Sequence, residues 1–159
     1  SFHVTGVQTC ALPILQTKAQ TLGIADRIRW IESVPHDQVP DYINLMDTLV
    51  LPSETTYEFK TLSAVGWKEQ FGHVLIEAMA CQVPVIGSDS GEIPYVIDDG
   101  GLVFPEGDHK ALAKQLQTLI QKPQQQQQLA KKGYARAMKH YTNKALATEL
   151  LAFYQELLA

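Results

Sequence analysis

Two carboxylates at a fixed spacing are the residues of this sequence best suited to chemistry. Glu69 and Glu77 have seven residues between them, and Phe71 and Gly72 lie in that interval. An ionised carboxylate in an apolar helix is costly unless a donor hydrogen-bonds to it, and ribose hydroxyls are suitable donors. Gly72, where the helix is expected to begin, leaves the first amides open to a phosphate. This short stretch could therefore bind a sugar, a diphosphate and a ribose in order.

The same residue types also have a purely structural interpretation. Glu77 could be the solvent-facing residue of an amphipathic helix, Glu69 a favourable acid near the helix dipole, and Gly72 a glycine required by packing. The residues alone leave the two interpretations evenly balanced.

Helical and strand patterns alternate along the chain from Leu15, with short connections between them. This alternation predicts an α/β fold, a three-layer Rossmann-like domain with a parallel sheet, whose ligand crevice lies at the carboxyl ends of the strands. The patterns predict strands at residues 28–31, 48–51, 84–87 and 102–104. They predict helices at residues 15–22, 37–46, 71–80, 108–121, 124–140 and 144–158.

Three connections have features of their own. Gly23 follows the first helix and accepts the left-handed conformation that a helix end often needs. Residues 52–68 show no periodicity, and a loop of this length inside a compact domain is usually functional or mobile. Residues 88–92 form a polar turn into a short helix, with Asp89 or Ser90 as its expected cap.

The bulk composition is that of an ordinary globular chain. Its 159 residues, 45% of them apolar and 19% charged, are enough to bury one core. The net charge of -4 and the pI near 5.7 argue against binding to nucleic acid or to an anionic membrane surface. Two cysteines cannot form a disulfide framework, and Cys81 lies in an apolar stretch where a buried small residue is expected. With neither a spanning apolar run nor a signal-peptide pattern, we expect a cytoplasmic protein.

The first fourteen residues differ from the rest of the chain. They show neither helical nor strand periodicity, and Val4-Thr-Gly-Val-Gln-Thr-Cys-Ala-Leu-Pro-Ile14 resembles the translation of a sequencing-library adapter. We interpret residues 1–14 as a non-native scar, which leaves Cys10 without a role, and residues 15–159 as the native domain. The alternative is a short loop or strand that leads into the next helix. Resequencing the locus distinguishes the two.

Two longer stretches carry the carboxylates and the turn that follows them. They are Trp67-Lys-Glu-Gln-Phe-Gly-His-Val-Leu-Ile-Glu-Ala-Met-Ala-Cys81 and Val83-Pro-Val-Ile-Gly-Ser-Asp-Ser-Gly-Glu-Ile-Pro94. Together they resemble the family 4 glycosyltransferases, over roughly residues 15–158 of the chain. The specific core of the resemblance is E-x7-E with an internal Phe-Gly, followed by Glu-Ala-Met-Ala. In that family two Rossmann-like domains face each other in the GT-B architecture, and the E-x7-E lies in the C-terminal one.

The resemblance implies a role for each residue that matches the motif. Glu69 is the implied catalytic residue, in contact with the hydroxyls of the donor sugar. Glu77 would hold the ribose, and the backbone near Ser33 and Val34, after the first strand, would meet the base. The implied donor-binding residues are Phe71, Gly72, His73, Val74, Glu77, Ser33 and Val34.

The implied function is the transfer of a hexosyl group, with retention of configuration, from a UDP- or GDP-linked sugar and without a cofactor. Residues 15–159 would be the C-terminal, donor-binding half of a GT-B enzyme, a fragment that is inactive by itself. The family's phosphate-binding Arg and Lys and its acceptor-binding N-terminal domain precede the part covered here. Any peripheral contact with a membrane would belong to that missing domain. Two alternatives stay open: a non-catalytic nucleotide-binding or interaction module, and a sugar-nucleotide epimerase.

Three positions depart from the family pattern. Glu32 stands where many relatives have glycine, and Gln82 stands where a glycine commonly follows Ala-Cys. Tyr95 follows Gly-x-Ile-Pro, where Glu is frequent. Each departure alters the shape of a loop more than it alters a ligand contact.

Other site chemistries find little support in the sequence. No Asp-x-Asp occurs, so a diphosphate held through a metal is unsupported, and we predict no metal. The histidines at positions 3, 36, 73, 109 and 140 lack ligand spacing, and only the backbone amide of His73 has an expected ligand role. The absence of G-x-G-x-x-G disfavours a dinucleotide oxidoreductase, and no distinctive Ser-His-Asp set is present.

Overall fold

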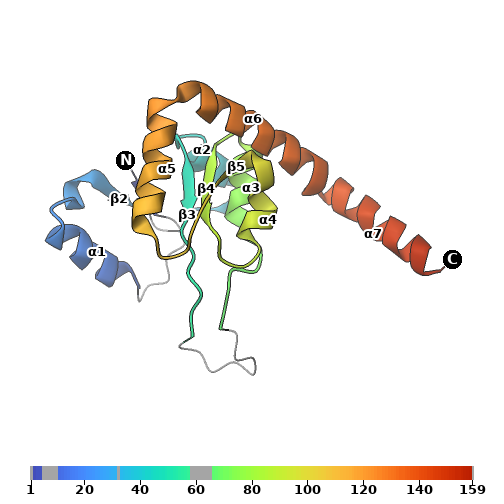
Figure 1. The fold of residues 1–159 in the computed structure, drawn as a ribbon, viewed down its shortest axis with the longest axis horizontal. Helices are drawn as coiled ribbons and strands as arrows, with labels where there is room; N and C mark the ends of the chain where they lie inside the picture. Colours follow the sequence, from blue (N-terminus) through green and yellow to red (C-terminus); the bar gives the residue numbers. More distant parts are fainter. Residues whose placement is uncertain (1, 5–10, 32, 58–65, 159) are drawn as a thin grey trace. The chain divides into compact units, whose positions relative to one another are not determined.

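The computed structural model describes residues 2–4, 11–31, 33–57 and 66–158. The chain forms two compact units, Ser1–Val39 and Pro40–Ala159, and each unit is described by itself. Figure 1 labels the α-helices and the strands β2 to β5, and its colours follow the sequence.

The first unit contains two paired strands and the helix between them. β1 (Phe2–Val4) pairs in parallel with β2 (Ile28–Trp30), and α1 (Ala11–Thr21) and η1 (Ala25–Arg27) connect them. The predicted strand at 28–31 is confirmed. The last element of the unit is η2 (His36–Gln38).

The helix predicted at residues 15–22 begins earlier, at Ala11, and ends as expected. Pro13 lies in its first turn, where the missing proline N–H removes no intrahelical hydrogen bond. Gly23, at φ +65°, donates its N–H to the Gln20 carbonyl, and Ile24 donates to Ala19 (3.0 Å each), which is a Schellman ending. Part of the segment 1–14 is therefore helix or strand, and residues 5–10, with Cys10, lie outside the described residues. That the segment is non-native stays a prediction.

The second unit is built on a parallel sheet, as the sequence predicts. Its strands are β3 (Leu49–Leu51), β4 (Val85–Ser88) and β5 (Gly101–Phe104), in the order β3-β4-β5. Both pairs are parallel, with Val85 opposite Leu49 on one side and Gly101 on the other. All four residues of β4 are buried, which is characteristic of a central strand covered on both faces.

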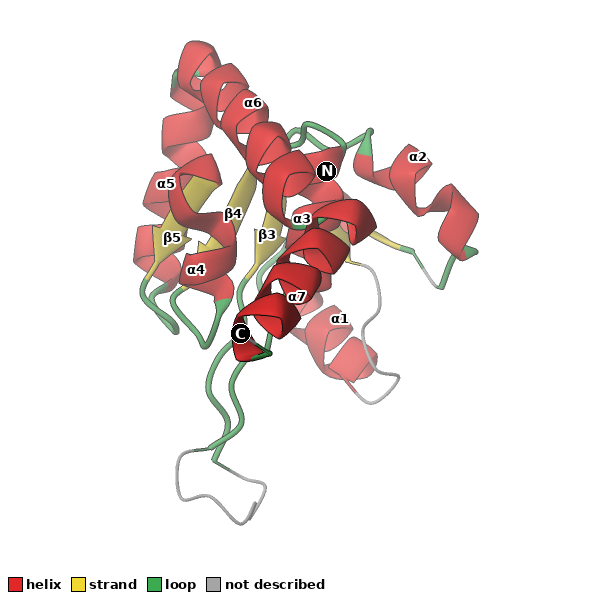
Figure 2. Cartoon of the chain, turned by 90° about the vertical axis from the view of Figure 1, so that its right-hand side faces the viewer, coloured by secondary structure: helices red, strands yellow, loops and turns green. Residues whose placement is uncertain are grey.

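Helices cover both faces of this sheet and make it a three-layer structure (Figure 2). The helices from residue 39 onward are α2 (Val39–Ile43), α3 (His73–Ala80), α4 (Ile93–Ile97), η3 (Asp98–Gly100), α5 (His109–Gln121), α6 (Pro123–His140) and α7 (Asn143–Leu157). Ile86 packs with Phe104 and with Leu119 of α5 on one face. On the other face Gly87 lies under α4, because a Cβ there would be 2.4 Å from Ile93. The predicted three-layer α/β fold is confirmed.

Two helices differ in length from the prediction. The helix predicted at residues 37–46 is only α2, preceded by η2 and closed by the short-range bond from the Met46 N–H to the Ile43 carbonyl (2.9 Å). The helix predicted at residues 71–80 begins at His73, because Gly72 has φ +74° and ψ 56°. A left-handed residue cannot continue a right-handed helix, so Gly72 is its boundary.

The three C-terminal helices follow the prediction closely. Asp108 caps α5, since its Oδ1 accepts the N–H of Lys110 and of Ala111 at 3.0 and 2.9 Å. Pro123 opens α6 and the five-glutamine run forms its first turns. Thr142 caps α7 by accepting the Ala145 N–H at 3.2 Å.

The long connection at residues 52–68 is described at both of its ends. Thr56 and Trp67 form an antiparallel bridge, with N–H to carbonyl distances of 2.9 and 2.8 Å in the two directions. The bridge joins the two described ends of the connection. Residues 58–65 lie outside the described residues.

Candidate functional site

The carboxyl ends of the three strands of the second unit are tied together by side chains. Ser88, the last residue of β4, donates its hydroxyl to the Ser53 carbonyl after β3 at 2.6 Å. Asp89 accepts the Glu106 N–H, after β5, on Oδ1 at 2.6 Å. In open α/β sheets the edge formed by the carboxyl ends is where ligands bind. The site residues predicted around Glu69 lie at this edge.

Glu69 lies shortly before α3 and contacts the residues that lead into it. Its Oε1 accepts the Gly72 N–H at 3.2 Å and lies 3.5 Å from the Phe71 nitrogen. Its Oε2 accepts the hydroxyl of Ser53 at 3.1 Å. A carboxylate here neutralises the positive end of the helix dipole, and the bond to Ser53 fixes it to the end of β3.

Gly72 is required by both conformation and space. It is buried, its φ is +74°, and a Cβ would be 2.9 Å from the Leu51 side chain and 3.0 Å from that of Leu75. Its carbonyl accepts the Leu75 N–H at 2.8 Å. The packing interpretation of Gly72 is therefore confirmed, and it is compatible with an open first turn.

A second glycine supports the same segment. The Glu69 carbonyl accepts the Glu92 N–H at 3.2 Å, and a Cβ on Gly91 would be only 1.9 Å from the Glu69 carbonyl oxygen. Gly91 has φ +55°, so it is also in the left-handed region. Gly91 lies inside the stretch that resembles the family, but its position in the sequence indicates no role for it. Only its contact with Glu69, which joins segments far apart in the chain, reveals the role.

The first two amides of α3 belong to predicted site residues, His73 and Val74. Neither N–H donates to a described residue, as expected at the start of a helix. The His73 ring is exposed and lies against Phe71 with a centroid distance of 4.8 Å. Val74 is half-buried. The open amides are the groups on α3 that could receive an anion.

Glu77 lies one turn after His73 on the same face of α3. It is half-buried, whereas Leu75, Ala78 and Met79 on the opposite face are fully buried. Its carboxylate makes no hydrogen bond or ion pair with a described residue. Burial, and secondarily the charge of Glu77, raises the pKa of the half-buried Cys81 thiol. Cys81 is thus held as a neutral thiol.

The predicted cap of α4 is wrong, and its correction reveals a contact that sequence reasoning missed. Neither Asp89 nor Ser90 caps α4, and Glu92 at the N-cap position makes no capping bond through its side chain. Asp89 binds the Glu106 amide instead. The Glu106 carboxylate accepts the hydroxyl of Thr55 at 2.9 Å, and the hydrogen bonds from Thr55 hold its pKa below the usual value. No pattern in the sequence marks Glu106, because its partners come from other strands.

Ser33 and Val34 are part of the first unit. They follow β2, as expected, and Ser33 is exposed whereas Val34 is half-buried. Glu69 and Glu77 belong to the second unit. Glu32, the first of the noted departures, lies outside the described residues.

Two further observations concern metals and membranes. Within residues 2–4, 11–31, 33–57 and 66–158, no three His, Cys, Asp or Glu side chains are grouped as metal ligands. The expected absence of a metal stays a prediction. Among the helices described, none has the length and apolarity needed to cross a bilayer.

Comparison with solved structures places the fold in a class. Sucrose-phosphate synthase from Thermosynechococcus elongatus superposes with a TM-score of 0.80 at 24% identity, over 98% of this chain and 38% of that one. HepE from Anabaena, in complex with UDP, gives 0.76 at 22% identity, over 94% of this chain and 40% of that one. The fold is thus that of a Rossmann-like half of a GT-B glycosyltransferase.

The family follows from the sequence comparison. The model described as "Glycosyl transferases group 1" matches residues 13–136, and the chain belongs to this family. D-inositol 3-phosphate glycosyltransferase from Streptomyces bingchenggensis is 32% identical over 111 residues, 69% of this chain and 22% of that protein. N-acetyl-alpha-D-glucosaminyl L-malate synthase from Bacillus anthracis is 28% identical over 141 residues, 87% of this chain and 33% of that protein. The chain thus spans a third or less of these relatives, and the predicted family resemblance is confirmed.

Proposed function

We propose that the second unit binds the diphosphate and ribose of a nucleotide sugar at the beginning of α3. The observation that carries this proposal is the arrangement of α3 itself. Its first amides open at the carboxyl edge of the sheet, and Glu69 and Glu77 lie on either side of them along the chain. A helix N-terminus at such an edge favours a phosphate group.

The open amides of His73 and Val74 would receive the diphosphate. The Glu69 carboxylate accepts the Gly72 N–H and so lies beside these amides. There it repels a negatively charged group and accepts hydrogen bonds from hydroxyls. We therefore assign Glu69 to the donor sugar, as the residue in contact with the reacting part. In transfer with retention, the helix amides would stabilise charge on the leaving diphosphate, without a metal.

Glu77 would accept hydrogen bonds from the ribose. It is half-buried without a partner among the described residues, and an ionised carboxylate in that position gains from a hydroxyl donor. Its place one turn beyond His73 suits a ribose that follows the diphosphate along α3. That the backbone near Ser33 and Val34 meets the base stays a prediction about the first unit.

UDP is the first nucleotide to test. HepE from Anabaena, which shares the fold, has been solved in complex with UDP and with UDP-glucose. GDP is the alternative that the sequence leaves open. Hexosyl transfer to an acceptor is proposed for a longer protein that includes an acceptor-binding domain, so we expect no turnover from these 159 residues.

Isothermal titration calorimetry with UDP and GDP tests the proposal. We expect wild-type chain to bind one of them weakly and Glu77→Ala to lose at least about tenfold in affinity, the value of a hydrogen bond to a charged group. Glu156→Ala is the matched control, since this glutamate on α7 is exposed. Absence of binding by wild-type chain would contradict the proposed function.

A nucleotide analogue sharpens the ribose assignment. If Glu77 binds the ribose hydroxyls, wild-type chain should prefer UDP over 2′,3′-dideoxy-UDP, and Glu77→Ala should bind the two equally. A preference that persists in Glu77→Ala would remove Glu77 from the ribose while leaving nucleotide binding intact.

A further inference from the structure

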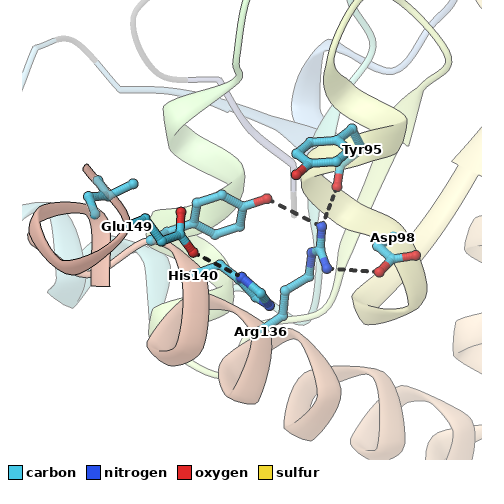
Figure 3. Close-up of a pocket in the computed structure, with 7 residues that line it drawn as sticks. Tyr95, Asp98, Arg136, His140 and Glu149 are labelled. Atoms are coloured by element: carbon cyan, nitrogen blue, oxygen red, sulfur yellow. Dashed lines mark hydrogen bonds and ion pairs between the residues drawn. The ribbon is translucent and has the colours of Figure 1, made fainter. Parts of the chain in front are cut away.

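Arg136 of α6 is fixed at the carboxyl end of α4. Its Nε donates to the Val96 carbonyl at 2.9 Å and its NH1 donates to Asp98 Oδ2 at 2.8 Å. Its NH2 donates to the Tyr95 carbonyl (Figure 3). The side chain is only 14% exposed, and a cation at this end of a helix satisfies carbonyls that have no intrahelical partner.

Tyr141, directly after α6, is held in position by Arg136. The Arg136 guanidinium carbon lies 5.8 Å from the centre of the Tyr141 ring, and NH2 lies 3.4 Å from the phenol oxygen. Burial raises the pKa of Tyr141, so the phenol is neutral in the folded protein. Arg136 and Tyr141 line a pocket of about 430 Å³ between α4, α6 and α7. Both acidic and basic side chains line this pocket, so its charge does not indicate whether it would bind an anion or a cation.

The Tyr141 ring also contacts the candidate site. Tyr141 and Phe71 pack edge to face, with ring centroids 5.6 Å apart and planes at 84°. Phe71 in turn contacts the His73 ring at 4.8 Å. A continuous series of contacts therefore runs from α4 through Arg136, Tyr141 and Phe71 to the first residue of α3.

We propose that Tyr141 is a positioning residue that sets the orientation of the Phe71–Gly72–His73 backbone, and with it the amides that receive the diphosphate. This inference rests on the proposed function. The Gly72 N–H is bonded to Glu69 and its carbonyl accepts the Leu75 N–H, but Gly72 has no side chain that packs, so the neighbouring Phe71 ring supplies the side-chain anchor of this segment. Without the Tyr141 ring, Phe71 can turn, which strains the hydrogen bonds at Gly72 and changes the direction of the open His73 N–H.

The experiment compares Tyr141→Leu, which removes the ring, with Tyr141→Phe, which keeps the edge-to-face contact and loses only the hydroxyl. Tyr134→Leu is the matched control, because Tyr134 lies on α6 and makes no aromatic contact with a described residue. Two readouts are recorded on the 159-residue chain: the backbone ¹H–¹⁵N shifts of Gly72 and His73 without ligand, and the Kd for UDP.

We expect Tyr141→Leu to move the Gly72 and His73 amide signals and to raise the Kd about fivefold to tenfold, the value of an aromatic pair. Tyr141→Phe and Tyr134→Leu should keep the wild-type signals and stay within about twofold of its Kd. Unmoved Gly72 and His73 amides in Tyr141→Leu would overturn the inference. Equal effects of Tyr141→Leu and Tyr134→Leu would overturn it as well, because they would indicate general loosening.

Failure of the positioning role of Tyr141 can be distinguished from failure of the proposed function and from misfolding of the variant. If wild-type chain binds neither UDP nor GDP, the proposed function fails, and the ligand-free amide signals still decide whether Tyr141 orients the segment. If Tyr141→Leu does not fold, Tyr141→Met takes its place. Nuclear Overhauser effects between the Tyr141 and Phe71 rings are measured in wild-type chain in either case, and their absence would overturn the inference.

Discussion

The two helices α3 and α5 begin in opposite ways. The first amides of α5 are held by its own N-cap residue, Asp108, through two hydrogen bonds. At α3 the N-cap residue is Gly72, which has no side chain, and the acid that reaches the helix comes from Glu69, three residues earlier. One helix start is completed locally, and the other depends on residues from several segments.

The difference concerns what each helix start can bind. At α5 the cap satisfies the amides of Lys110 and Ala111, so an anion would have to displace Asp108. At α3 the amides of His73 and Val74 stay open, and Glu69 is fixed by Ser53 and by the backbone at Gly91. A cap stabilises a helix, whereas an uncapped and rigidly positioned start is suited to a ligand.

Gly91→Ala should have the largest effect on the free energy of unfolding, because it forces the turn around Gly91 away from Glu69, the residue that this turn supports before α3. The new Cβ would meet backbone, the Glu69 carbonyl oxygen at 1.9 Å, in a residue with positive φ. We expect a loss of about 3 kcal/mol in the free energy of unfolding, measured by urea denaturation. Gly107→Ala, at φ +77° before α5, meets only the end of Glu54 at 3.7 Å and should cost about 1 kcal/mol. Similar losses in the two variants would contradict the close approach at Gly91.

Removing the two acids should separate stability from binding. Asp108→Ala should lower the free energy of unfolding by about 1 kcal/mol and leave the Kd for UDP unchanged. Glu69→Gln should tighten the binding of UDP about threefold, because the carboxylate repels a phosphate at the same helix start. Calorimetric titration of both variants gives the result. Weaker binding of UDP by Glu69→Gln would show that the carboxylate does not compete with the phosphate.

A substitution after the end of α3 should have the smallest effect on the free energy of unfolding. Both ends of this helix are flanked by a left-handed residue, Gly72 at the start and Gln82, at φ +58°, after the end. Gln82→Gly relieves the strain at that position but adds freedom to the unfolded chain, so we expect a gain of about 0.5 kcal/mol in urea denaturation. A loss of stability would mean that the Gln82 side chain contributes packing that outweighs the strain.

The sequence predicts what depends on local pattern. Apolar runs and alternation predict the strands and helices of the three-layer domain, and Gly23 and the Asp108 region predict two helix ends, because each depends on residues that are neighbours in the chain. The starts of α1 and α2 differ from the prediction. Pro13 and Pro40 lie in the first turns of these helices, where proline is tolerated, so neither proline fixes the residue at which its helix begins.

The sequence predicts which residues form the candidate site, but it does not predict which of them contact one another. Glu69, Gly72 and Glu77 stand out by spacing and by resemblance, and the structure brings Glu69 and Gly72 together. The wrong cap at Asp89 and the missed role of Gly91 have the same physical cause. Their partners, Glu106 and Glu69, are neighbours only after the strands of the sheet have paired.

An NMR titration of the wild-type chain with UDP tests the central claim most directly. If α3 begins with an open anion site, the backbone amide signals of His73 and Val74 should shift progressively as UDP is added. Those of Lys110 and Ala111, at the capped start of α5, should stay in place. Unmoved His73 and Val74 amides, or equal shifts at the two helix starts, would contradict the account.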